Sequence, residues 1–144
     1  MNPWIDIVDS LQAPSERMNA LRLIEDGRVG ARANRGRPLP PDRVDALIWG
    51  LSHASPVVRR CCLELLDQHP DDRARPHIVR CLSDPVPRVR WHAVHALICD
   101  ACKAGTSYLA ADVVSRLREL AQSDPSRKVR AQAQWGLQQA NICT

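Results

Sequence analysis

Four side chains that could bind a metal ion follow one another closely in the middle of this 144-residue chain: His92, His95, Cys99 and Cys102. On an α-helix, where each residue turns by about 100°, the four fall into one stripe. Imidazole nitrogen and thiolate sulfur are donors that zinc prefers, in tetrahedral arrangement. One straight helix rarely surrounds an ion, so His95 and Cys99 would need ligands from a neighbouring element. The alternative is that the cysteines pack against adjacent helices and the histidines lie on the surface. The sequence favours this alternative, and we expect neither a metal nor a cofactor.

The spacing of His95 and Cys99 is also compatible with nucleophilic catalysis, because a histidine one helical turn away can deprotonate a thiol. No group that would orient the histidine and no loop that would bind an oxyanion is apparent in the sequence. Glycine-rich phosphate loops are absent from it as well. We therefore expect a non-catalytic protein, with a metal- or thiol-dependent site around His95 and Cys99 as an alternative.

A basic segment without hydrophobic periodicity covers residues 28–40 and is rich in glycine and proline. Its arginines, with one more just beyond it, are Arg28, Arg32, Arg35, Arg37 and Arg43. Arginine contacts phosphate well, and a basic segment can follow a nucleic-acid backbone independently of sequence. Nucleic-acid binding through residues 28–43 is therefore one interpretation, and a solvated linker is the other.

Short amphipathic helices in repeated pairs must position these residues. Three segments share one pattern, PVVR at 56–59, PRVR at 87–90 and RKVR at 127–130, and small and apolar residues follow each at the same offsets. The periodicity predicts helices over 41–52 and 56–68, 76–82 and 87–101, and 109–122 and 127–140. Ser55 and Ser126 are expected to cap the second helix of their pairs, whereas Asp84 would cap the middle one from a longer distance.

The chain divides into three parts by these patterns. Residues 1–27 resemble a degenerate N-terminal capping hairpin, residues 28–40 form the basic linker, and residues 41–144 hold three repeats. No apolar run is long enough to span a bilayer, and no signal peptide is visible at the N-terminus. We therefore expect a cytoplasmic protein without membrane contact, whose cysteines are reduced thiols.

The repeats resemble the HEAT family, in particular the short bacterial type found in proteins related to phycobilin lyases. The middle repeat carries the family pattern, with residues Leu82, Asp84, Pro87, Val89, Arg90, Ala93 and Leu97. The resemblance implies an all-α fold, a short right-handed α-solenoid whose second helices line the concave side. It also implies contacts between repeats made by Arg59, Arg90 and Arg130 with Asp84 and Asp124. His53 replaces the first aspartate of the pattern.

Outward positions on the second helix of each repeat are the predicted partner-binding surface. Its residues are Arg60, Glu64, Trp91, His95, Trp135 and Gln139. Tryptophan and arginine are enriched at interaction hot spots because they bury large areas. We therefore expect a scaffold that binds another protein through this concave surface. Packing of Trp135 beneath a second copy of the chain, as a homo-oligomer, is an alternative.

Overall fold

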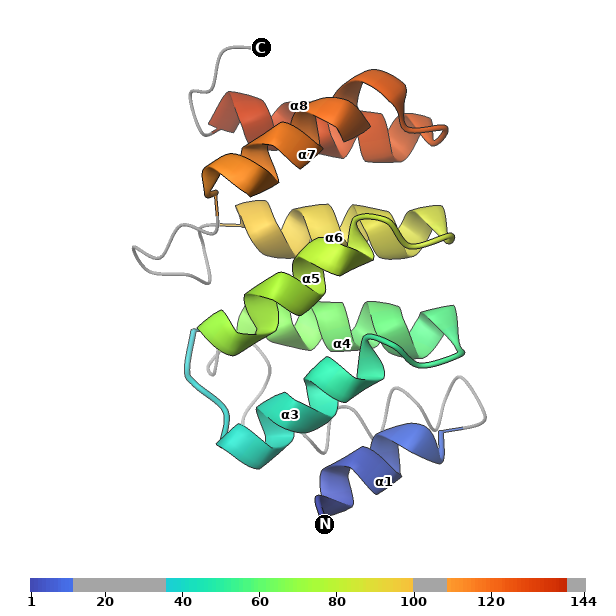
Figure 1. Cartoon of the computed structure of the whole chain (residues 1–144), viewed down its shortest axis with the longest axis vertical. Coiled ribbons are helices and arrows are strands. Elements are labelled where there is room, and N and C mark those ends of the chain that lie inside the picture. Colours follow the sequence, from blue (N-terminus) through green and yellow to red (C-terminus); the bar gives the residue numbers. More distant parts are fainter. Residues whose placement is uncertain (12–35, 100–108, 140–144) are drawn as a thin grey trace.

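The computed structural model describes residues 1–11, 36–99 and 109–139 of the chain (Figure 1). These ranges contain helices and no β-strand: α1 (Pro3–Asp9), α3 (Pro41–Gly50), α4 (Pro56–Gln68), the 3₁₀ turn η1 (Asp72–Ala74), α5 (Arg75–Cys81), α6 (Pro87–Ile98), α7 (Ala111–Ser123) and α8 (Arg127–Gln139). None of these helices is both long enough and apolar enough to cross a membrane. The all-α prediction is confirmed for the described part of the chain.

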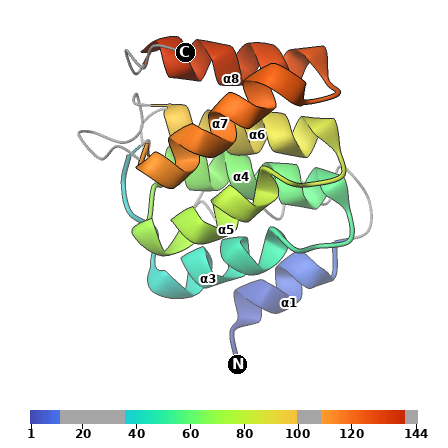
Figure 2. The same cartoon turned by 45° about the horizontal axis from the view of Figure 1, so that its top comes forward.

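The helices form two layers, which we call the A layer (α3, α5 and α7) and the B layer (α4, α6 and α8). The B helices lie side by side and run in the same direction, with one A helix crossing each of them (Figures 1 and 2). The repeated valines Val58, Val89 and Val129 are fully buried between the layers. Since each repeat buries the same positions, one continuous core extends along the stack, as the sequence pattern predicts.

The middle B helix is shorter than predicted. It ends at Ile98 rather than near residue 101, because the backbone of Cys99 turns to an extended conformation (φ −73°, ψ 104°). The Cys99 N–H still donates to the carbonyl of His95 over 2.9 Å. The predicted stripe of four donors on one helix is therefore wrong at Cys99, which lies just past the end of α6. Cys102 lies outside the described residues.

Arginines connect successive repeats, as the family resemblance implies. Arg59 pairs with Asp84 through two hydrogen bonds of 2.7 and 3.0 Å, and Arg90 pairs with Asp124 through bonds of 2.8 and 2.9 Å. These predicted contacts are confirmed. Arg130 instead donates to the carbonyls of Asp124 and Pro125.

The turns before the B helices repeat one arrangement of hydrogen bonds. Asp84 Oδ1 accepts from the Val86 N–H at 2.9 Å, and Asp124 Oδ1 accepts in the same way from Ser126. His53 takes this role in the first repeat, because its Nδ1 accepts from the N–H of Ser55 at 3.0 Å. The predicted Ser55 cap is wrong, since its side chain makes no capping bond to α4. Ser126 Oγ does accept from Val129, over 3.4 Å.

The N-terminal helix α1 lies against α3 (Figure 1). Asn2 caps α1 and also donates to the carbonyl of Asp42, whose carboxylate accepts from the indole N–H of Trp4. The Arg43 guanidinium stacks over the Trp4 ring, 4.6 Å from its centre. The second helix predicted for residues 1–27 lies outside the described residues, and the three-part division of the chain stays a prediction.

Candidate functional site on the B-helix face

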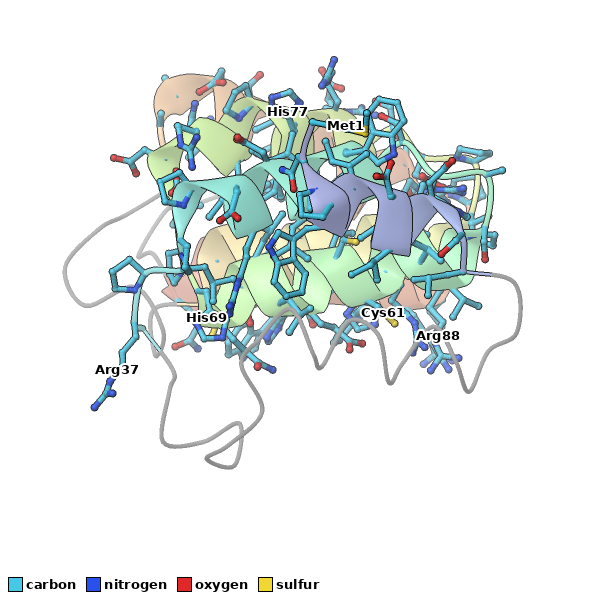
Figure 3. The ribbon with its side chains drawn as sticks, turned by 90° about the horizontal axis from the view of Figure 1, so that it is seen from below. Met1, Arg37, Cys61, His69, His77 and Arg88 are labelled. Carbon is cyan, nitrogen blue, oxygen red and sulfur yellow. The ribbon has the colours of Figure 1, made fainter. Side chains whose placement is uncertain are left out.

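The outer surface of the B layer, turned away from the A helices, is called the B-helix face below. Arg88 and Cys61 lie on this side in Figure 3, whereas His77 lies on the opposite side, among the A helices. The face carries the six residues predicted to bind a partner: Arg60 and Glu64 on α4, Trp91 and His95 on α6, and Trp135 and Gln139 on α8. The residues therefore come in pairs from three neighbouring helices, one helix from each repeat.

Two tryptophans contribute aromatic surface to the B-helix face. Trp135 is 46% exposed, which is unusual for so large an apolar side chain. Trp91 is half-buried and stacks on the imidazole of His95, with ring centres 5.5 Å apart and planes 4° from parallel. The imidazole of His92 and the same indole form a T-shaped pair, with ring centres 4.8 Å apart. Trp91 is therefore held rigidly, whereas much of Trp135 faces solvent.

His95 connects all three B helices. Its Nε2 lies 3.5 Å from the Asp67 carboxylate on α4, and its Nδ1 lies 3.4 Å from the side-chain amide of Gln132 on α8. Together with the stacking on Trp91, these contacts fix the plane of the imidazole. The orienting group that sequence reasoning did not find for His95 is therefore supplied by the two neighbouring repeats.

His92 lies beside a carboxylate and yet is held in its neutral form. Its Nε2 is 3.6 Å from Glu64, but Glu64 is also within 3.8 Å of the Arg60 guanidinium. Burial lowers the pKa of His92 to about 4, and the positive charges of Arg60 and Arg88 add to this effect. At neutral pH, His92 therefore presents an uncharged aromatic surface.

The low pKa of His92 makes the stability of the fold depend on pH. In the unfolded chain this histidine binds a proton below about pH 6.5, whereas in the folded chain it does so only near pH 4. The free energy of unfolding should therefore fall as pH decreases through this interval. After discounting for the partial exposure of His92, we expect a loss of about 1–2 kcal/mol.

Urea unfolding at about pH 7.5 and at about pH 4.5 measures this loss. His92→Gln should reduce the difference between the two pH values more than His77→Gln does, because burial and the nearby Arg80 also lower the pKa of His77 but only the shift of His92 is large. An identical pH dependence in wild-type protein and His92→Gln would show that His92 does not cause it.

A hollow of about 480 Å³ opens on the B-helix face between the first turns of α6 and α8. Its described lining residues are Pro87, Arg88, Trp91, His92, Ser126 and Lys128. Arg88 and Lys128 are exposed, and no acidic side chain is in this lining. The hollow therefore combines an aromatic wall with two cations. Sequence reasoning identified Trp91 but missed this hollow, because its two sides come from repeats 40 residues apart.

A second group of polar residues lies near the other end of α6. One ligand atom each from Asp67, His95 and Cys99 lie within 4.8 Å of one another. The spacing of His95 and Cys99 indicated this pair, but Asp67 was missed. The sequence offers one signal for Asp67, which is a charged residue in an apolar helix. In the structure, Asp67 is only 7% exposed. Carboxylate, imidazole and thiol together can bind a transition-metal ion.

Two other cysteines, Cys62 and Cys81, are poorly suited to nucleophilic chemistry. Burial raises the pKa of the Cys62 thiol far above its usual range and raises that of Cys81 to about 11. The thiolate is the reactive form of cysteine, so both side chains act as small apolar groups in the core.

The basic residues predicted to bind nucleic acid are not brought together in the described part of the chain. Arg28, Arg32 and Arg35 lie outside the described residues. Arg37 is exposed near the end of α4, where its carbonyl is 2.8 Å from Nδ1 of His69 (Figure 3). Arg43 packs instead on Trp4, between α1 and α3. Nucleic-acid binding by this segment stays a prediction.

A comparison with known protein families decides which family these helical pairs represent. A family profile described as HEAT repeats matches residues 44–138, which is most of the chain. The chain belongs to the HEAT-repeat family. This match does not distinguish the subtype related to phycobilin lyases, which stays a prediction. No curated protein matches the chain. HEAT repeats are commonly protein-interaction scaffolds and are typically non-catalytic.

Proposed function

We propose that this HEAT-repeat protein is a non-catalytic interaction module that binds an acidic, partly apolar segment of another protein. The segment would occupy the hollow between the first turns of α6 and α8 on the B-helix face. The observation that carries this proposal is an aromatic wall, Trp91 and His92, placed between the exposed cations Arg88 and Lys128.

Charge in the hollow favours a carboxylate. Arg88 and Lys128 supply two positive charges, and the N-termini of α6 and α8 add the positive ends of their helix dipoles. Such partial charges stabilise an anion by roughly 0.3–1 kcal/mol each at an exposed site. An aspartate or glutamate side chain of the partner would therefore be stabilised both by the two cations and by the two helix dipoles.

The aromatic wall favours an apolar neighbour for that carboxylate. Trp91 is held against His95, and His92 stays uncharged at neutral pH. Rigid aromatic groups bury area at small entropic cost, which is why they are frequent at interaction hot spots. Trp135, further along α8, offers a second contact for a longer partner.

Fluorescence anisotropy with a labelled peptide tests this proposal. The probe is a short peptide rich in aspartate and glutamate with a central leucine, and the comparison peptide has lysine at the acidic positions. The double variant Arg88→Glu/Lys128→Glu should weaken binding of the acidic peptide by at least about tenfold. Arg80→Glu/Arg118→Glu is the matched control, because it changes net charge equally at exposed positions of the A layer.

Equal weakening in both double variants would mean that only net charge matters, and the proposed hollow would be rejected. Binding of a labelled DNA duplex that competes with the acidic peptide, and that is lost in Arg88→Glu/Lys128→Glu, would assign the same surface to nucleic acid and overturn the proposal. A labelled copy of the chain itself measures self-association in the same assay.

A further inference from the structure

We propose that Asp67, His95 and Cys99 form a binding site for one divalent ion of the zinc class. The site would join the first and second repeats on the B-helix face, because Asp67 belongs to α4 whereas His95 and Cys99 lie at the end of α6. It is separate from the proposed peptide-binding hollow, which lies at the opposite end of α6, and it does not depend on that proposal.

The distances among the three donors are close to those of a zinc site. The ligand atoms lie within 4.8 Å of one another, and His95 Nε2 is 3.5 Å from Asp67 Oδ2. Zinc bonds of about 2.0–2.3 Å in a tetrahedral arrangement place donors roughly 3.3–3.8 Å apart. The widest separation therefore has to close by about 1 Å. Cys99 is the donor whose shift would close this separation, because its backbone is extended just past the end of α6.

With its amide turned over, Gln132 would orient His95 as expected for a metal ligand. The amide of Gln132 lies at Nδ1 of the imidazole, and a rotation of this amide by 180° presents its oxygen in place of its nitrogen. Nδ1–H then donates to Gln132, which leaves Nε2 unprotonated on the side of Asp67. Histidines that bind metals almost always donate their other ring N–H in this way. Gln132 is thus a positioning residue for the site.

The donor set selects the class of ion. Magnesium and calcium are bound by oxygen donors, so a site with one imidazole and one thiolate disfavours them. Zinc accepts nitrogen, sulfur and oxygen together. Binding would release the Cys99 thiol proton to solvent, and the charges of the Asp67 carboxylate and the Cys99 thiolate would then balance the two positive charges of the ion. Three protein donors leave the fourth position to water.

Metal titration of the full chain, freed of metal by a chelator, tests this site. Isothermal titration calorimetry with zinc should give about one ion per chain, and cobalt should produce the thiolate-to-metal absorption of a cysteine ligand. Bound zinc should also protect Cys99 from alkylation, as measured by peptide mass spectrometry. Cys99→Ser, His95→Gln and Asp67→Asn should each weaken zinc binding by at least about tenfold, and Gln132→Leu by about 10–100-fold.

His77→Gln is the control, since this histidine lies on the A layer and should leave zinc binding unchanged (Figure 3). Circular dichroism identifies any variant that fails to fold. If Asp67→Asn is among them, the conservative Cys99→Ser variant still decides the question. A stoichiometry near zero would overturn the proposal. So would zinc binding that Cys99→Ser leaves unaltered, because the ion would then lie elsewhere in the chain.

Discussion

Replacing Asp124 by alanine should lower the free energy of unfolding by about 3–5 kcal/mol, because it leaves the largely buried, positively charged guanidinium of Arg90 without its carboxylate partner. The Arg90 side chain is only 11% exposed, and that of Asp124 is 2% exposed. Asp124 also accepts from the backbone N–H of Ser126 at the start of α8. The substitution therefore removes both a contact between repeats and the hydrogen bond that closes the turn before α8.

The state of ionisation of Asp124 supports this expectation. Burial alone would raise its pKa, but the hydrogen bonds from Arg90 and Ser126 outweigh burial and lower it. A carboxyl group with a lowered pKa stabilises the fold above its unfolded pKa, here 3.8, and this contribution is lost as pH falls through the folded value. The effect of Asp124→Ala should therefore be fully present at neutral pH.

Urea unfolding followed by circular dichroism measures the effect. Arg73→Met is the control, because Arg73 forms ion pairs with Asp45 and Asp71 at an exposed position, and we expect a loss of at most about 1 kcal/mol. The double variant Arg90→Met/Asp124→Leu should recover part of the stability lost in Asp124→Ala, since it leaves no buried charge. If Asp124→Ala costs no more than Arg73→Met, the ladder does not stabilise the stack.

Substituting Gly136 by alanine should destabilise the protein by about 1–2 kcal/mol, although this exchange is favourable in most helices. Alanine gains about 1 kcal/mol over glycine in a helix interior. Here an added Cβ would lie 2.7 and 2.8 Å from two side-chain carbons of Ile98 on the neighbouring helix α6. Such overpacking costs typically 1–3 kcal/mol, and the branched, buried Ile98 has little freedom to rotate away.

Thermal and urea unfolding of Gly136→Ala measure this cost, and Gln138→Ala at an exposed position of the same helix is the matched control. Gln138→Ala should be neutral or slightly stabilising. In the double variant Gly136→Ala/Ile98→Ala, the loss should be smaller than the sum of the two single losses, because the added methyl group fills space that Ile98 has vacated. A stabilised Gly136→Ala protein would contradict the close approach of α6 and α8.

Much of the fold was predictable because its determinants are local and repeated. Val58, Val89 and Val129 recur at equivalent positions and are all fully buried. The pairs Arg59–Asp84 and Arg90–Asp124 were implied by the resemblance to the HEAT family, and the structure confirms both. The ends of the elements were less predictable. Ser55 has the chemistry of a capping residue, but its side chain makes no capping bond to α4, and its backbone N–H donates to Nδ1 of His53.

The candidate sites depended on how neighbouring helices are offset. Sequence spacing brought His95 and Cys99 close within one repeat, but it could not place Asp67 beside them, because that contact depends on how α4 and α6 pack against each other. The hollow has the same origin, since its two cations, Arg88 and Lys128, come from neighbouring repeats.

The repeated hydrophobic pattern was enough to establish that the chain is a stack of helical pairs, and the resemblance to the HEAT family implied the arginine–aspartate ladder. Hydrophobic periodicity and repeated motifs act within or between identical units, so they can be read along the chain. Packing between repeats was needed to show that Asp67 and Gln132 hold His95, and that burial keeps His92 neutral. These properties arise from burial and from contacts between different repeats, which no spacing in the sequence specifies.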